Sequence, residues 1–431
     1  MCHCQPRSVY NGSIRYDTTA VQLDDFLQKQ KLMKKNPVSQ NVTIAILFWL
    51  HAYPLSSVNS QDVQVTTGKL APVLQPFVDS HTLAGAVVLV ADPQKVLDIE
   101  AVGFSDIAAG KKMRTDAMFW IASQSKPMTC TALMILVDEG KVNVDDPVEK
   151  YLPEFKGQMF IAEKDDEHAV LRKPKQIMLV RHVMSHTSGL PGVTPIMQPK
   201  LDAIPLSRTV IANSMISLAT EPGTKYQYAN PGINTVGRIV EVVSGMPYEQ
   251  FMQERIFTPT GMSDTTFWPN KEQLSRLAKS YRPTADKKNI EETTVDQLQY
   301  PLDDHVHRHA FPGGGLFSTA GDLSRFYRML ANQGNFEGKR ILSEQSIAQM
   351  TVDQTGDLKQ GYGFGYRCVP DSIGHGGAYG TYSSFDPERK LITIFLGQHA
   401  SWANDGKTIL KLFQTAATEM FESETAKEKS R

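Results

Sequence analysis

Two side chains near residue 125 could perform nucleophilic chemistry together. Ser123 and Lys126 stand three positions apart and form the only Ser-x-x-Lys in the chain. On a helix, this spacing places both side chains on one face. The serine hydroxyl can then pass its proton to the lysine amine, provided that burial or neighbouring groups keep the amine partly neutral. The pair therefore indicates a serine nucleophile, and the alternative is a helix cap followed by a solvated lysine.

Two later segments could complete such a site. Tyr228 and Asn230 follow a turn and precede a helical stretch, where a phenol can relay protons and an amide can bind a carbonyl group. His375 is followed by two glycines, whose backbone N–H groups a reacting molecule can approach closely. Each segment alone is more typical of an ordinary turn. The prediction therefore depends on their occurring together with Ser123 and Lys126.

A helix is expected to position Ser123 and Lys126. The apolar residues 119–121 lead into Ser123, and an apolar-periodic stretch then continues to Gly140. Pro127 is tolerated only in a first helical turn, and Gly140 suits the C-terminal end of a helix. We therefore predict a helix whose N-terminus holds Ser123. The N–H groups of that first turn favour negative charge that develops beside the serine.

Both ends of the region after residue 80 have the pattern of paired strands. Residues 83–90 and 96–102 are apolar runs joined by a turn, and residues 383–385 and 391–396 repeat this pattern. Helical spacing of apolar residues dominates between them. We therefore predict an α/β fold of the α+β type, in which an antiparallel sheet from both chain ends is flanked by helices and accompanied by a mainly helical region. The predicted helical stretches are residues 128–137, 233–243 and 323–330.

The first 60 residues have the pattern of a processing segment. A short apolar run at residues 42–50 follows two lysines and precedes small polar residues, as in a secretory signal peptide. The run is shorter than the ~20 apolar residues of a membrane-spanning helix, so we predict no permanent membrane span. The expected location is periplasmic or secreted after cleavage before Gln61. The predicted segments are an upstream extension at 1–32, a signal peptide at 33–60, a catalytic domain at 61–421 and a disordered tail at 422–431.

Composition narrows the classes of partner. The 45 Lys and Arg residues against 46 Asp and Glu give a formal charge of −1, whereas a surface that tracks phosphates needs a basic excess. With 41% hydrophobic and 21% charged residues, the chain has the composition of an ordinary globular protein. We therefore expect a small-molecule or peptide substrate and no nucleic acid. Cys130 and Cys368 would remain after processing, and isolated thiols are the more typical state for two distant cysteines.

The order of the three segments resembles a known superfamily. Ser123-x-x-Lys126, Tyr228-x-Asn230 and His375-x-Gly377 are similar to the three motifs of the penicillin-recognising serine hydrolases. This superfamily includes class C β-lactamases, D-Ala-D-Ala carboxypeptidases, D-aminopeptidases and related esterases. Residues 180–190 and 312–319 are also similar to recurrent family segments, so the resemblance covers about residues 70–412.

The resemblance implies a β-lactamase/DD-peptidase-like fold and an acyl-enzyme mechanism with no cofactor and no metal. Ser123 would attack a carbonyl, while Lys126 and Tyr228 would share the proton transfers as a pair. The backbone N–H groups of Ser123 and Ala378 would form the oxyanion hole, and water would release the acyl group. The implied substrate-binding residues are Asn230, His375, Gly377 and Ala378.

His375 departs from classical β-lactamases. Those enzymes have lysine at this position, and that lysine engages the carboxylate of the drug. His-Gly-Gly is instead similar to the esterase and D-aminopeptidase branches, and a neutral histidine attracts an anion more weakly at pH 7. We therefore predict an esterase or D-amino-acid peptidase. A β-lactamase or a penicillin-binding carboxypeptidase is the alternative.

Two alternatives come from other classes of protein. His305, His307 and His309 alternate along the chain and could ligate zinc, which would indicate a metallohydrolase, although no further ligand cluster accompanies them. A protein of the same fold could also bind cell-wall peptides without catalysis. The intact Ser123 and Lys126 argue against such a binder.

Two other histidines are candidates for a general base. His182 and His186 stand four positions apart on a helical stretch. We interpret both as stabilising the turn at residues 187–189 rather than as catalytic groups.

Overall fold

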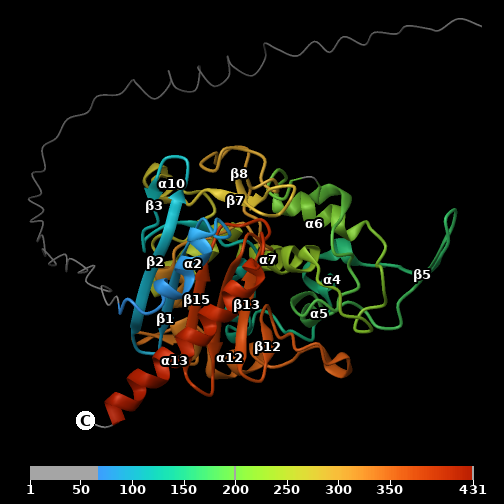
Figure 1. The fold of residues 1–431 in the computed structure, drawn as a ribbon. Coiled ribbons are helices and arrows are strands. Elements are labelled where there is room, and N and C mark those ends of the chain that lie inside the picture. Colours follow the sequence, from blue (N-terminus) through green and yellow to red (C-terminus); the bar gives the residue numbers. More distant parts are fainter. Residues whose placement is uncertain (1–66, 199, 430–431) are drawn as a thin grey trace, which may run out of the picture. The chain divides into compact units, whose positions relative to one another are not determined.

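The computed structural model describes residues 67–198 and 200–429 (Figure 1). The predicted upstream extension at 1–32, the signal peptide at 33–60 and the cleavage point before Gln61 lie outside the described residues. In the described part of the chain, no helix is both long and apolar enough to cross a membrane.

A seven-stranded sheet is the central element of the described residues, with the strand order β12-β13-β14-β15-β1-β2-β3. Its neighbouring strands run antiparallel, and β1 near the start pairs with β15 near the end, Val87 lying opposite Leu396. The predicted sheet from both chain ends is therefore confirmed. The strands are β1 (Gly85–Ala91), β2 (Val96–Asp106), β3 (Lys111–Lys112), β12 (Arg367–Val369), β13 (Ser372–Gly377), β14 (Thr381–Asp386) and β15 (Leu391–Leu396).

Both faces of the sheet are covered, which explains why its central strands are apolar throughout. Successive side chains of a strand point to opposite faces, so Val87 and Leu89 join one core while Val88 and Val90 join another. The helices α2 (Ala71–Asp79) and α13 (Ile409–Lys429) pack together on one face, as Figure 1 shows in front of the sheet. On the other face lies α11 (Ala320–Ala331), which contacts β1 and β15.

The helical region between the strands is built around α3 (Ser125–Asp138). Nearly every residue of this helix is buried, and α7 (Asn230–Ser244) packs against it. The three predicted helical stretches lie within α3, α7 and α11. The further helices are α4 (Val148–Tyr151), α5 (Val180–Met184), α6 (Leu206–Ser214), α8 (Tyr248–Met252), α9 (Thr258–Thr260), α10 (Lys271–Arg276) and α12 (Glu344–Met350). Short two-stranded sheets are β4 (Phe119–Trp120) with β9 (Phe317–Ser318), β5 (Phe160–Lys164) with β6 (Ala169–Arg172), β7 (Ser280–Pro283) with β8 (Ile290–Thr293), and β10 (Asn335–Phe336) with β11 (Lys339–Arg340).

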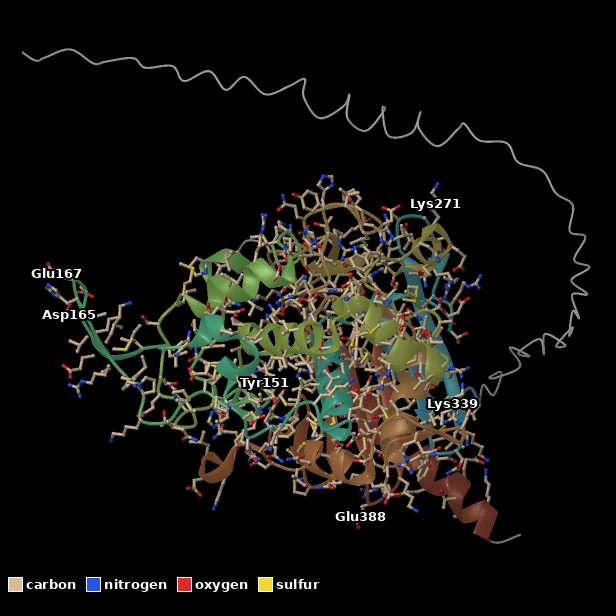
Figure 2. The ribbon with its side chains drawn as sticks, turned by 180° about the vertical axis from the view of Figure 1, so that it is seen from behind. Tyr151, Asp165, Glu167, Lys271, Lys339 and Glu388 are labelled. Carbon is tan, nitrogen blue, oxygen red and sulfur yellow. The ribbon has the colours of Figure 1, made fainter. Side chains whose placement is uncertain are left out.

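Two segments lie at the periphery of the domain. The β5–β6 hairpin extends away from the rest of the domain, with Asp165 and Glu167 at its tip (Figure 2). Residues 422–429 of the predicted disordered tail are helical, because α13 continues to Lys429. Glutamate and lysine make up five of these eight residues and are strong helix formers, which explains the extension.

A buried carboxylate attaches α2 to the sheet. Glu100 on β2 is 2% exposed and accepts hydrogen bonds from the backbone N–H groups of Lys69 at 2.9 Å, Leu70 at 3.2 Å and Ala71 at 2.7 Å. Such N–H groups at a helix start have no partner within the helix. Burial alone would raise the pKa of the Glu100 carboxyl, but hydrogen bonds, led by that of Ala71, leave it lowered. The charged carboxylate therefore stabilises the start of α2.

Glu100→Gln is expected to lower the free energy of unfolding by about 1–3 kcal/mol. The amide NH₂ cannot accept a hydrogen bond, so a buried backbone N–H loses its partner, and the favourable charge at the helix N-terminus is lost. Urea unfolding would measure the change. The control is Glu388→Gln in an exposed turn (Figure 2), expected to stay within about 0.5 kcal/mol of wild type. Equal effects of the two substitutions would contradict this role of Glu100.

Candidate active site

Ser123 lies in a short 3-10 turn, Ala122–Gln124, directly before α3. Ala122 has a φ of 47°, in the left-handed region that non-glycine residues seldom adopt. This dihedral interrupts the helical backbone, so α3 starts at Ser125 rather than at Ser123 as the sequence predicted. Pro127 falls in the first turn of α3, and Gly140 follows its end with a φ of 68°. The turn thus presents Ser123 ahead of a rigid buried helix.

The side chains of Ser123 and Lys126 lie within hydrogen-bonding distance. Lys126 Nζ is 2.8 Å from Ser123 Oγ, and it also donates to the carbonyl oxygen of Gly313 at 2.6 Å. The lysine is completely buried, and this burial lowers its pKa to about 7. Near neutral pH, a substantial fraction of Lys126 is therefore unprotonated and able to accept the serine proton.

The backbone just before the carbonyl that binds Lys126 is held by α3. Thr129, one turn further along α3, hydrogen-bonds through its hydroxyl to the carbonyl of Pro312 at 2.8 Å and to the hydroxyl of Tyr248 at 2.7 Å. All three residues are buried around the backbone that continues into Gly313. Sequence reasoning missed Thr129 and Tyr248 because their role depends on the packing of α3 against α8.

Tyr228 lies beside the Ser123 and Lys126 pair. Lys126 Nζ is 4.7 Å from the centroid of the Tyr228 ring. Burial of the phenol raises the pKa of Tyr228 above its usual value, and an interaction with the Ser123 hydroxyl offsets this only in part. The phenol is therefore protonated at neutral pH and can donate a proton. The residue still has 39% of its surface exposed, so a ligand can reach it.

Asn230 begins α7 and has an unsatisfied amide oxygen. Its Oδ1 is buried and has no hydrogen-bond partner among the described residues. A Cβ added to Gly313 would lie 3.0 Å from this oxygen, which places Asn230 next to the carbonyl segment that holds Lys126. An unpaired buried amide at this position can hydrogen-bond a ligand.

His375 supplies a neutral ring to the third segment. It lies on β13 opposite Ser383 and is 7% exposed. Burial, with a smaller effect of the Lys126 charge, lowers the pKa of His375 to about 3. The ring centroids of His375 and Tyr228 are 6.0 Å apart, so the second and third segments meet. The third segment therefore contributes no positive charge through His375 at neutral pH.

Glycine is required at position 377 by a close backbone contact that the sequence did not reveal. A Cβ at this position would lie 2.2 Å from the carbonyl oxygen of Ile121 and 2.3 Å from Thr381 Oγ1. Only a glycine lets the end of β13 approach the backbone that leads into Ser123. Ala378 follows in the exposed loop between β13 and β14.

The two histidines of the 180–190 segment behave differently. His182 Nδ1 accepts a hydrogen bond from the N–H of Leu179 at 3.2 Å and so stabilises the start of α5 locally. His186, interpreted from the sequence as stabilising the turn at residues 187–189, also contacts the second segment, because the centroid of its ring lies 4.4 Å from that of Tyr228. Its Nε2 is 3.2 Å from the hydroxyl of Tyr362, a residue that sequence reasoning did not select.

The histidines of the zinc alternative do not form a cluster. His305 stacks on Trp268, whereas His307 contacts Asp304 and Tyr300. In the described ranges, no group of three or more His, Cys, Asp or Glu side chains could hold a metal ion. The metallohydrolase alternative therefore has no geometric support. Cys130 and Cys368 are both free thiols.

A family model described as "Beta-lactamase" matches residues 70–415, which is most of the chain. The chain belongs to the β-lactamase family. It is accordingly a serine hydrolase, as members of this family are.

Individual proteins and a solved structure are also similar to this chain. An uncharacterized protein of Mycobacterium tuberculosis is 32% identical over 362 residues, covering 74% of this chain and 87% of the relative. Penicillin-binding protein 4 of Amycolatopsis lactamdurans is 30% identical over 317 residues, covering 71% and 77%. Among solved structures, EstCE1, described as a hydrolase with promiscuous acyltransferase activity, superposes with a TM-score of 0.67 at 22% identity, covering 81% of this chain and 97% of that chain. The last similarity shows the fold.

Gly377→Ala is expected to destabilise the protein by about 1–3 kcal/mol, because its Cβ would overlap the Ile121 carbonyl and force β13 away. The matched control is Gly376→Ala, whose Cβ would meet nothing closer than the Tyr382 ring at 3.4 Å, and we expect a change within about 0.5 kcal/mol. Thermal unfolding of both variants would measure the difference. A similar loss in both would contradict the close approach at Gly377.

The rate of the reaction is expected to rise with pH through about 7 and then level off. Lys126 can accept the Ser123 proton only when unprotonated, and the fraction of that form increases as pH rises through the lowered pKa. The measurement is kcat/KM from pH 5 to 9. Lys126→Arg, which keeps the charge but cannot lose its proton, should reduce kcat/KM by about 10²–10⁴-fold at every pH. A rate that falls as pH rises through 7 would instead require the lysine cation.

Proposed function

We propose that this β-lactamase family member cleaves esters or amides through an acyl-enzyme on Ser123, with esterase or D-amino-acid peptidase activity favoured. The observation that carries the proposal is the 2.8 Å contact between Ser123 Oγ and Lys126 Nζ, made by a lysine with a lowered pKa. A serine with such a neighbour can become a nucleophile at neutral pH.

The residues around Ser123 support a two-step mechanism. As Ser123 Oγ bonds to the substrate carbonyl carbon, its proton passes to the Lys126 amine, and the carbonyl oxygen gains negative charge. The backbone N–H groups of Ser123 and Ala378 stabilise this oxyanion. Lys126 and Tyr228 then return a proton to the departing alcohol or amine as the carbonyl re-forms. Water attacks the resulting ester on Ser123 by the reverse proton path and releases the acid.

The neutral third segment favours a substrate without a negative charge. His375 has a pKa of about 3, so at neutral pH it does not offer the charge that would bind a carboxylate strongly. An ester or amide without a carboxylate places no unpaired anion in this part of the site. A β-lactam or a D-Ala-D-Ala peptide carries such an anion. The alternative of a β-lactamase or carboxypeptidase is nevertheless kept as a test, because one relative is named a penicillin-binding protein.

A substrate panel tests the proposal. The panel contains short-chain aryl esters, D-amino-acid amides, a D-Ala-D-Ala peptide and a chromogenic cephalosporin. We expect turnover of the esters or amides that lack a carboxylate to exceed that of the two carboxylate-bearing substrates. Ser123→Ala should abolish this turnover, and mass spectrometry after a slow acylating agent should place the adduct on Ser123.

Ser125→Ala provides the matched control. Ser125 is buried, and its hydroxyl already donates to the carbonyl of Ala122 at 2.7 Å, so it is not available as the nucleophile. This variant should still acquire the adduct on Ser123. Wild-type turnover by Ser123→Ala would overturn the nucleophile assignment, and turnover lost on chelation would favour the metallohydrolase. A wild-type protein that shows neither turnover nor adduct would favour the non-catalytic binder.

A further inference from the structure

A chain of hydrogen bonds connects the second and third segments of the site behind the residues that face the substrate. His186 Nε2 lies 3.2 Å from Tyr362 Oη, and the same hydroxyl lies 3.0 Å from His375 Nε2. His186, Tyr362 and His375 are 1%, 3% and 7% exposed. The mechanism proposed above uses neither His186 nor Tyr362, so two buried polar residues beside the site have no assigned role.

His186 holds the backbone on both sides of Tyr228. Its carbonyl oxygen accepts a hydrogen bond from the N–H of Gln227 at 2.8 Å, and its Nδ1 accepts one from the N–H of Ala229 at 3.2 Å. Its ring also packs on the Tyr228 ring, with the two ring centroids 4.4 Å apart. Tyr228 lies outside regular secondary structure, so these contacts replace the support that a helix or strand would give it. His186 itself adopts a φ of 61°, a strained value for this residue type.

The partners at the two ends of this series of hydrogen bonds fix the direction of each hydrogen bond in it. A backbone N–H can only donate, so His186 Nδ1 is unprotonated and its Nε2–H donates to Tyr362 Oη. At the other end, His375 Nδ1 lies 2.5 Å from the carbonyl oxygen of Gly376, which can only accept, so this Nδ1 carries the hydrogen. His375 Nε2 is then free to accept the hydroxyl hydrogen of Tyr362.

We propose that His186, Tyr362 and His375 form a directional positioning relay, which fixes the Tyr228 phenol against Ser123 and holds His375 in its Nδ1–H form. His186 and Tyr362 are positioning residues, because they act through Tyr228 and His375. This inference rests on the proposed function for its catalytic consequence. The hydrogen-bond arrangement itself can be tested without a substrate.

Most groups that face His375 disfavour a charge on its ring, and only the Gly376 carbonyl raises its pKa. A proton on Nε2 would point at Tyr362 Oη and displace the hydroxyl hydrogen from its acceptor. Lys126 on α3 and Arg367 on β12 both lower the pKa of His375 through their charges, and no carboxylate is among the groups that shift it. The titratable groups in and around the relay in the described residues are Lys126, Cys130, His186, Tyr226, Tyr228, Tyr327, Tyr362, Arg367, Cys368, His375 and Tyr382.

The principal test compares two tyrosine hydroxyls in the same cluster. Tyr362→Phe removes the central hydroxyl of the relay, whereas Tyr226→Phe removes a hydroxyl whose ring lies 5.8 Å from the Tyr362 ring and which makes no hydrogen bond within the described ranges. We expect Tyr362→Phe to lower kcat by about 10- to 100-fold with KM within about two-fold, because displacement of a reacting group by about 1 Å has this effect. Its kcat/KM should keep the rise through about pH 7, because Lys126 is unchanged. Tyr226→Phe should keep the wild-type profile.

Histidine NMR gives a readout that is independent of activity. With ¹⁵N-labelled histidine, the wild-type protein should show His186 as the Nε2–H form and His375 as the Nδ1–H form from pH 5 to 8. In Tyr362→Phe, the His375 Nε2 signal should shift because this nitrogen loses its hydrogen-bond donor, while the ring stays neutral. Identical forms for both rings in the wild type would overturn the relay, even if Ser123 were shown to be the nucleophile. Failure to acylate Ser123, with the two forms as stated, would overturn the proposed function alone.

A second variant guards against a folding defect. His186→Asn removes the imidazole, while asparagine tolerates the positive φ better than most residues do. Circular dichroism first establishes that each variant is folded. If the residues act as one relay, the double variant should be no slower than the slower single variant. Losses in kcat that multiply in the double variant, or equal losses in Tyr362→Phe and Tyr226→Phe, would contradict the proposal.

Discussion

The removal of one lysine amine from water is the constraint on which the site depends. A buried amine can remain unprotonated only if no carboxylate lies close enough to stabilise its cation. Burial is the main cause of the lowered pKa of Lys126, and the direct partners of the amine are a hydroxyl and a backbone carbonyl rather than an acidic side chain. The fully packed surroundings of α3 therefore have a chemical purpose as well as a structural one, because a hydrated Lys126 would be a cation.

The fold brings three distant segments to this amine by closing the sheet between the chain ends. The pairing of β1 with β15 places β13 and β14 in the same sheet as the first strands, so the end of β13 reaches the backbone before Ser123. The packing of α7 on α3 places Tyr228 and Asn230 at the same point from the helical side. The site thus lies where the sheet and the helical region meet, and neither part alone would complete it.

The sequence allowed the main elements and the order of the motifs to be predicted, because apolar periodicity and the residues at helix ends depend on local physics. It could not reveal that Ala122 leaves the helical region, since nothing in its neighbours requires this dihedral. The roles of Gly313, His186 and Tyr362 also stayed hidden, because each acts through a contact between residues far apart in the chain. The helical end of α13 was missed because a charged segment at a terminus is equally typical of a disordered tail.

The left-handed backbone of Ala122 costs conformational energy but restricts the shapes that the turn can adopt. A left-handed dihedral costs an alanine about 1–2 kcal/mol, whereas glycine would adopt it freely. Glycine would also let the turn sample other shapes, and the hydroxyl that follows would lose its single direction. The methyl group therefore restricts the turn: the domain tolerates backbone strain at Ala122, and the orientation of the Ser123 side chain is set before any ligand arrives.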